Sequence, residues 1–212
     1  MARRFRRPQP ILAPKPKIVI ACEGAKTERL YLNDLKTVNR LTSVEIIFLE
    51  HEGTDPRTIV RQVATRVREE RRAKAWNAER DAAWAVFDGE EHCQTPGQLV
   101  NWNAAIQQAR DLKINLALSN PSFEFWYLLH FQDYFRSLTR HEALRLLRDH
   151  LPSYQKSDRV YIQLQPLTND AMSKAEDLRQ RAERNCVEPY ENPCCWGVAL
   201  LVKSLLELSV SR

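Results

Sequence analysis

Acidic residues directly follow two short apolar segments of the sequence. Glu23 ends the first of these segments, and Asp88, Glu90 and Glu91 follow the other. Carboxylates held close together repel one another and become partly protonated unless a cation compensates them. Because Mg²⁺ keeps several waters, one or two carboxylates together with substrate phosphates are enough to bind it. The pattern therefore predicts a site for Mg²⁺ or Mn²⁺. In the alternative interpretation, Glu90 and Glu91 only begin a solvated loop.

Four strands that alternate with helices would position these acids. Short apolar runs rich in β-branched residues predict the strands, and apolar residues at helical spacing predict the helices. The expected strands are 18–22, 44–49, 82–87 and 114–118, and the helices between them are 26–40, a helix that begins at Pro56, and 96–111. Such alternation predicts an α/β fold with a mostly parallel four-stranded sheet. Ligands of open α/β sheets bind at the carboxyl ends of the strands, where the acids would meet.

The remainder of the chain has mainly helical patterns. The expected helices are 122–131, 140–151, 170–185 and 196–209. Between them, the irregular stretch 152–168 is either a loop or carries a short extended segment at 159–164. We therefore expect a basic, proline-rich flexible arm (1–16), an α/β core (17–121) and a helical C-terminal part (122–212) that packs on the core.

The basic character of the chain belongs to the arm. The 212 residues carry a formal net charge of +5. Six of the basic residues precede residue 20, with no acid among them: Arg3, Arg4, Arg6, Arg7, Lys15 and Lys17. Without these six, 26 basic residues face 27 acidic ones, a net charge of −1. The arginines of the arm could neutralise phosphates of RNA or DNA, or the arm could be a disordered solubilising tail.

Composition excludes several classes of protein. Hydrophobic residues make up 43% and charged residues 28% of the chain, as in ordinary globular domains. No apolar run is long enough to cross a membrane, and no apolar stretch of the kind found in signal peptides follows the N-terminal arginines. The five cysteines contain no C-x-x-C pair, so neither a disulfide framework nor a thiolate zinc site is indicated. The expected location is the cytoplasm, with no membrane association.

Four blocks of the sequence resemble those of the RloB-like family. Residues 22–28 (CEGAKTE) resemble its C-E-G-x-x-T-E opening, and residues 86–92 (VFDGEEH) resemble its F-D-x-D-[DE]-H segment. Residues 119–126 (SNPSFEFW) resemble its S-N-P-x-F-E-x-W block, the most specific of the four. Asn192-Pro193 and the apolar residues after it resemble the N-P-x-T…L-V ending.

This resemblance implies a Toprim-type α/β domain and assigns roles to the acids. Glu23 would act as general acid/base and metal ligand, Asp88 as the first Mg²⁺-binding aspartate, and Glu90 as the second acid. The sequence departs from the family pattern at Glu90, where Asp is common, and Glu91 could take its place. The resemblance also implies a prokaryotic antiviral defence setting, with a partner ATPase of the AAA or ABC type.

The implied activity is metal-dependent cleavage of phosphodiester bonds in RNA or DNA, and several further residues are candidates to take part. Lys26 would act in catalysis, and the expected substrate-binding residues are Gly24, Thr27, Ser119, Asn120, Glu124 and His92. Five of these residues also have a simpler interpretation. Lys26 could be an exposed lysine, and His92 could have no chemical role. Ser119 and Asn120 could cap a helix, and Glu124 could interact only with a helix dipole.

Two other functions fit the same residues. A non-catalytic partner or sensor subunit could bind an ATPase or an invader signal and keep the acidic pocket for sensing. A small-molecule phosphotransferase or phosphatase would share the chemistry, but the sequence contains no G-x-x-x-x-G-K-[ST] phosphate loop. The sequence leaves open whether the nucleic acid is RNA or DNA and whether the protein forms a homodimer.

Overall fold

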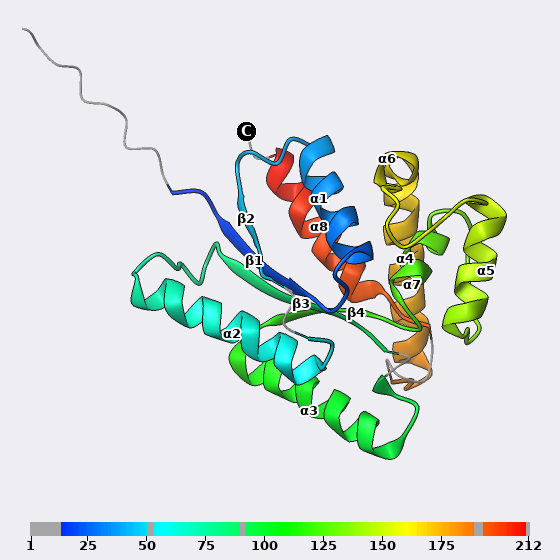
Figure 1. Ribbon diagram of the computed structural model, residues 1–212, viewed down its shortest axis with the longest axis horizontal. Helices are drawn as coiled ribbons and strands as arrows, with labels where there is room; N and C mark the ends of the chain where they lie inside the picture. The colour runs from blue at the N-terminus through cyan, green and yellow to red at the C-terminus, as the bar shows by residue number, and fades with distance from the viewer. Residues whose placement is uncertain (1–13, 51–52, 90–91, 189–192, 211–212) are drawn as a thin grey trace, which may run out of the picture.

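The computed structural model describes residues 14–50, 53–89, 92–188 and 193–210. Its strands β1 (Lys17–Cys22), β2 (Glu45–Phe48), β3 (Ala82–Asp88) and β4 (Asn115–Ser119) form one parallel sheet in the order β2-β1-β3-β4 (Figure 1). Strand β2, the next strand in the chain after β1, lies on one side of β1, and β3 lies on the other side. The topological switch point therefore lies between β1 and β3, the place where ligands of such sheets bind.

All four predicted strands are confirmed to within about one residue at each end. The central strands are buried on both faces, which explains their nearly continuous apolar runs. Along β1, Ile18 and Ile20 point to one hydrophobic cluster, and Val19 and Ala21 point to the other. This alternation is the two-residue period of a strand.

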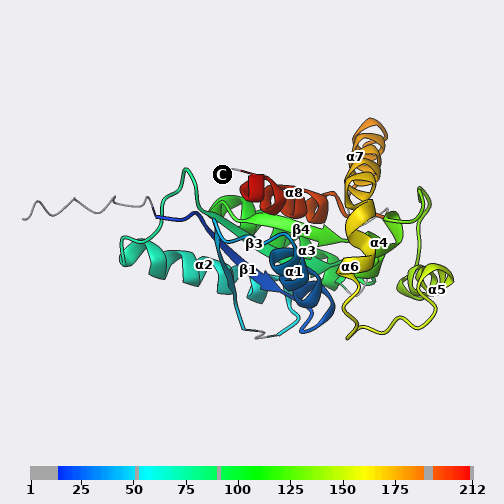
Figure 2. The same ribbon diagram turned by 90° about the horizontal axis from the view of Figure 1, so that it is seen from above.

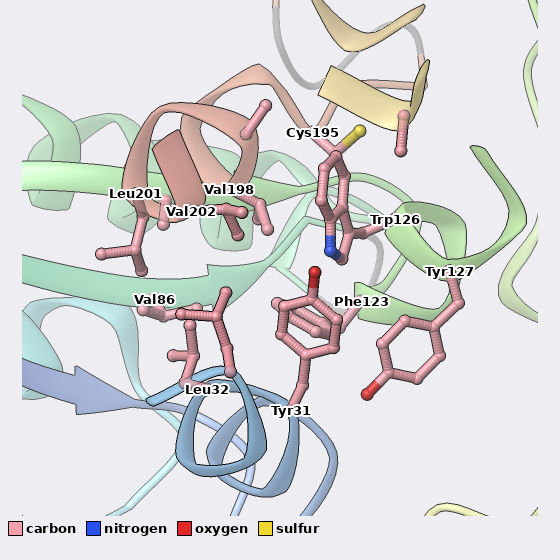
Figure 3. Close-up of a cluster of buried hydrophobic side chains, with 14 of the residues drawn as sticks. Tyr31, Leu32, Val86, Phe123, Trp126, Tyr127, Cys195, Val198, Leu201 and Val202 are labelled. Carbon is pink, nitrogen blue, oxygen red and sulfur yellow. The ribbon is translucent and has the colours of Figure 1, made fainter. Parts of the chain in front are cut away.

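Helices cover both faces of the sheet. Helices α2 (Pro56–Arg72) and α3 (Pro96–Leu112) cover one face, and α1 (Thr27–Val38) and α8 (Trp196–Val210) cover the other (Figure 1). The core beneath α1 and α8 contains Tyr31, Val86, Trp126, Val198 and their neighbours (Figure 3). This core contains residues of both the expected α/β core (17–121) and the expected C-terminal part (122–212), because α8 packs on β4. None of the helices in the described parts of the chain is long and apolar enough to span a membrane.

The remaining helices lie beyond the tips of the strands (Figure 2). They are α4 (Phe123–Leu129), α5 (Arg140–His150), α6 (Tyr161–Leu164), the 3₁₀ helix η2 (Gln165–Leu167) and α7 (Thr168–Arg184). The short extended segment considered for 159–164 is wrong. Tyr161 and Leu164 are both buried, three residues apart on one face of α6, and the Tyr161 hydroxyl accepts a 2.7 Å hydrogen bond from Asn39 of the chain just after α1.

Helix α2 begins at the predicted position. The Asp55 side chain accepts a 2.8 Å hydrogen bond from the Thr58 backbone N–H, and Pro56 occupies the first helical position. Thr54, which precedes this cap, lies at the tip edge of the sheet, so α2 starts beside the strand tips and runs back along the sheet.

Candidate active site

A cavity of about 340 Å³ opens at the tips of β1 and β3. Four buried acidic residues from different elements line it: Glu23, Glu28, Asp88 and Glu124. Basic side chains on its wall are Lys26, Arg140 and Lys156. The cavity therefore combines a buried acidic floor with basic groups, at the switch point of the sheet.

Glu23 and Asp88 lie side by side, as their positions at two strand tips predict. One carboxylate oxygen of Glu23 accepts a 2.8 Å hydrogen bond from the Asp88 backbone N–H, and the other lies 3.0 Å from His92 Nε2. The backbone explains this contact, because the Glu23 N–H donates to the Val86 carbonyl and so continues the pairing of β1 with β3. Both oxygens of Glu23 are thereby held in place.

The carboxyl of Asp88 is only half compensated. Its Oδ2 accepts a 3.0 Å hydrogen bond from Arg140 Nη2, whereas its Oδ1 is buried and has no hydrogen-bond partner. Burial is the main cause that raises the pKa of Asp88 well above its ordinary value, and the charges of Glu28, Glu23 and Glu124 raise it further. Arg140 opposes the shift but does not cancel it.

Glu28 is folded back over Gly24. A β-carbon at position 24 would lie 2.0 Å from Glu28 Oε2, so only glycine leaves room for this carboxyl. Burial raises the pKa of Glu28 to about 7, and the charges of Glu124 and Glu23 add to the shift, while backbone amides oppose it. Gly24 is needed here for close approach rather than for a left-handed backbone, which among the described glycines only Gly53 adopts.

Glu124 contributes a second unpartnered oxygen. Its Oε2 accepts a 2.6 Å hydrogen bond from the Ser122 hydroxyl, and its buried Oε1 has no hydrogen-bond partner. The residue lies in the first turn of α4, and the cis peptide bond between Asn120 and Pro121 lies just before that helix.

The oxygen atoms at this place suit a hard divalent cation. Asp88 Oδ1 and Glu124 Oε1 are carboxylate oxygens without other partners, in a cavity lined by two further acids. Within the described ranges, no group of three or more His, Cys, Asp or Glu side chains is spaced to hold a metal by itself. Because Mg²⁺ needs only one or two carboxylates and fills its other positions with water and phosphate, the residues fit an open Mg²⁺ or Mn²⁺ site.

The other predicted residues differ in where they lie. Gly24, Lys26 and Thr27 line the cavity together with Glu124, and the Thr27 hydroxyl donates to the Lys156 carbonyl. His92 lies behind Glu23 rather than on the cavity wall.

Ser119 and Asn120 do not line the cavity. Ser119 is fully buried, and the Asn120 backbone forms a two-way bridge with Cys194. This bridge fixes the start of α8 against the end of β4, which gives the S-N-P block a role in the fold. Glu90, Glu91 and the arm arginines Arg3, Arg4, Arg6 and Arg7 lie outside the described residues.

Sequence reasoning assigned no part in the site to four polar residues of the cavity: Glu28, Thr54, Arg140 and Lys156. Glu28 could have been found, because it lies in the same block as Glu23 and faces the same tip. Arg140 and Lys156 come from the segments after β4, and no spacing in the sequence links them to Asp88.

A doubly wound parallel sheet with acids at its switch point defines an α/β domain whose ligand site lies at the strand tips. The family model described as RloB-like protein matches residues 18–205. The chain therefore belongs to the RloB-like family. Neither the search of curated proteins nor the search of solved structures gave a significant match.

Proposed function

We propose that the protein is a metal-dependent nuclease that cleaves phosphodiester bonds in RNA or DNA with Mg²⁺ or Mn²⁺. The observation that carries this proposal is that Asp88 and Glu124, which line one cavity with two more acids, each keep a buried carboxylate oxygen without a hydrogen-bond partner. Uncompensated buried carboxylates destabilise a fold, and a bound divalent cation would remove that penalty.

The residues of the cavity would have different roles in cleavage. Asp88 and Glu124 would hold the ion, together with the acids at positions 90 and 91 that the sequence predicts as ligands. The ion, when bound, supplies positive charge to the phosphoryl oxygens and lowers the pKa of bound water. Lys26, Arg140 and Lys156 would bind phosphate oxygens.

Glu23 is proposed as the residue that accepts and returns a proton during cleavage. Its carboxylate is fixed by the Asp88 N–H on one side and by His92 on the other. A general base of this kind acts only when its carboxylate is held at a defined position, and these two contacts provide that orientation.

The cellular setting is part of the same proposal. Resemblance to the RloB-like family supports a cytoplasmic toxic effector in a prokaryotic anti-phage system that works with an AAA- or ABC-type ATPase. The Toprim-type assignment rests on the same resemblance and on the acids at the tips of β1 and β3.

A cleavage assay tests the proposal. Labelled single-stranded RNA, single-stranded DNA and duplex DNA are incubated with the protein, with and without the proposed ATPase partner, in Mg²⁺, in Mn²⁺ and in EDTA. Because the ion contributes several kcal/mol, Glu23→Gln and Asp88→Asn should each lower cleavage at least about 100-fold. Glu79→Gln, which neutralises an exposed acid near the opposite edge, should have no effect. Full activity of both site variants, or equal cleavage in EDTA, would refute the proposal.

One observation favours a second candidate, the non-catalytic partner or sensor subunit. Arg140 already neutralises part of the Asp88 charge, so a cation from the protein occupies one side of the acid group. In this case no cleavage is observed with any substrate, metal or partner, and Arg140→Gln changes binding of the ATPase rather than turnover.

A further inference from the structure

Helix α2 exposes a row of arginines along one side. The row consists of Arg57, Arg61, Arg68, Arg71 and Arg72, whose spacing places them within about one third of the helix circumference. All five are exposed, and in the described parts of the chain none of them forms an ion pair with an acidic side chain. Arg66, on the opposite side of the helix, is instead paired with Glu70 at 2.7 Å.

The row ends at a second cavity of about 280 Å³, at the edge of the sheet opposite the strand tips. Arg68, Arg71 and Lys113 line it together with the half-buried ring of Trp76. The one acid on its wall, Asp81, is compensated, because its carboxylate accepts hydrogen bonds from the backbone N–H groups of two residues and from Arg80. The cavity therefore presents cationic groups and an aromatic surface.

Helix α2 extends from the acidic cavity at the strand tips to the second cavity. Thr54, two residues before the helix, lines the acidic cavity, and Trp76, four residues after it, lines the second one. A helix of 17 residues spans about 25 Å, and Figure 1 shows α2 running along the sheet from the strand tips to the opposite edge. The arginine row thus forms a basic path along the helix that extends between the two cavities.

The first described residues of the chain lie at the same edge as the second cavity. Arg80 donates a 2.9 Å hydrogen bond to the Pro14 carbonyl, and the Lys17 N–H donates to Asp81 on the cavity wall. The chain before Pro14 carries Arg3, Arg4, Arg6 and Arg7. The basic sequence therefore joins the fold beside the end of the arginine row.

We propose that this path, the α2 arginine row with the Trp76 cavity, binds single-stranded nucleic acid that extends from the active site. The inference rests on the proposed nuclease function and adds the strandedness of the substrate and the surface that holds it. Guanidinium groups pair with phosphate oxygens, and an unpaired base stacks on an aromatic ring. Duplex nucleic acid offers no unpaired base to the Trp76 cavity, which is why a single strand fits better.

Binding in EDTA tests the path without relying on cleavage. The fluorescence anisotropy of a labelled 20-nucleotide single strand is titrated with full-length protein at several salt concentrations. The variant Arg61→Gln/Arg68→Gln/Arg71→Gln should bind at least tenfold more weakly. Its salt slope, the slope of the logarithm of the binding constant against the logarithm of the salt concentration, should fall in magnitude by about 2, since each lost phosphate contact removes about 0.7. A control with the same charge change elsewhere, Lys36→Gln/Arg184→Gln/Lys203→Gln, should bind within about twofold of the unaltered protein. Equal binding by the two triple variants would overturn the proposal.

A second pair of variants tests stacking. Trp76→Ala should weaken binding at least about fivefold, whereas Trp76→Phe, which keeps an aromatic ring, should retain most of the affinity. Thermal unfolding of both variants checks that the fold is kept. Unchanged binding by folded Trp76→Ala would overturn the base-binding role of the cavity. The variant Arg61→Gln/Arg68→Gln/Arg71→Gln separates the two proposals. If this variant loses binding but the unaltered protein cleaves no substrate, the binding path is supported and the nuclease function is refuted. If the variant binds normally and still cleaves, only the binding path is refuted.

Discussion

Two groups of buried acids differ in how their charge is compensated. Near the starts of β1 and β3, Glu70 is paired with both Lys17 and Arg66, and Asp81 accepts from Arg80 and from two backbone N–H groups. At the tips of the same strands, Arg140 is paired with Asp88 and His92 contacts Glu23, while Asp88 Oδ1 and Glu124 Oε1 have no hydrogen-bond partner.

This difference separates acids that stabilise the fold from the acids that we propose to act in function. Acids that hold a structure together are matched by cations or amides, because an uncompensated buried carboxylate destabilises the protein. Four of the seven buried acids of the described chain lie together at the strand tips, whereas Asp34, whose Oδ2 also lacks a hydrogen-bond partner, is a single acid paired with Arg159 through its Oδ1. Proteins keep buried carboxylates without compensating groups mainly at functional sites.

The largest effect is expected from Glu28→Gln on the metal-free protein. The folded-state pKa of Glu28 is about 7, above the ordinary value of 4.5, so the folded protein binds more protons than the unfolded chain between these values. Stability therefore falls as pH rises from about 4.5 to 7, and the uncharged variant escapes this loss. At pH 8, Glu28→Gln should raise the free energy of unfolding by about 1–3 kcal/mol.

Urea unfolding at pH 5 and pH 8 measures this effect. The gain should shrink toward pH 5, where Glu28 is protonated in the folded protein. A gain of the same size at both values would mean that the carboxyl charge is not its cause.

Arg140→Gln should act in the opposite direction. Removing the guanidinium leaves Asp88 with less compensation and should cost about 1–2 kcal/mol at pH 8. The corresponding change at the compensated group, Arg66→Gln, should cost less, because Glu70 keeps its contact with Lys17. The double variant Asp88→Asn/Arg140→Gln should recover most of the loss in a double-mutant cycle of urea unfolding. Purely additive losses would show that the two side chains are not coupled.

Gly24→Ala should disturb the site more than the fold. The added methyl group would collide with the Glu28 carboxyl, which must move away from its neighbours. We expect Mn²⁺ affinity to fall about tenfold, or about 1.4 kcal/mol, measured by calorimetric titration. Gly97→Ala is the control, since a β-carbon at position 97 meets no atom within 4 Å, and it should leave Mn²⁺ binding unchanged. Equal affinities of both variants and the unaltered protein would remove Glu28 from the site.

The smallest effect is expected from deletion of residues 1–13. Loss of the four arm arginines should weaken binding of a single strand a few-fold in 0.15 M salt and lower the salt slope by about 1, because about one or two phosphate contacts are lost. The midpoint of thermal unfolding should not change, because the hydrogen bond between Arg80 and Pro14 is kept. An unchanged slope would identify the arm as a passive tail.

The sequence predicted the sheet well for a simple physical reason. Buried parallel strands need continuous apolar runs, and 18–22 and 82–87 have few other interpretations. The same reasoning placed Glu23 and Asp88 at one edge of the sheet, because parallel strands end at the same edge, whereas the pairing of β1 with β3 comes from the structure.

The rest of the site depends on contacts that no local pattern encodes. Arg140 reaches Asp88 from a helix 52 residues away, and its place follows from how α4 and α5 pack beyond the tips. Residues 161–164 become helical because Tyr161 packs against α1, a tertiary contact that outweighs their extended preference. Likewise, Ser119 is buried at the end of β4, although a serine at a strand end would suit substrate binding equally well.

Calorimetric titration of the protein with Mn²⁺ at pH 7.5 tests the central claim most directly. The unaltered protein should bind Mn²⁺, and Asp88→Asn and Glu124→Gln should each bind it at least tenfold more weakly, because each removes one of the two unpartnered oxygens. Neutralising a compensated acid by Glu70→Gln should leave the affinity unchanged. Equal Mn²⁺ affinity in all four proteins, or no binding to the unaltered protein, would contradict a divalent cation site at the strand tips.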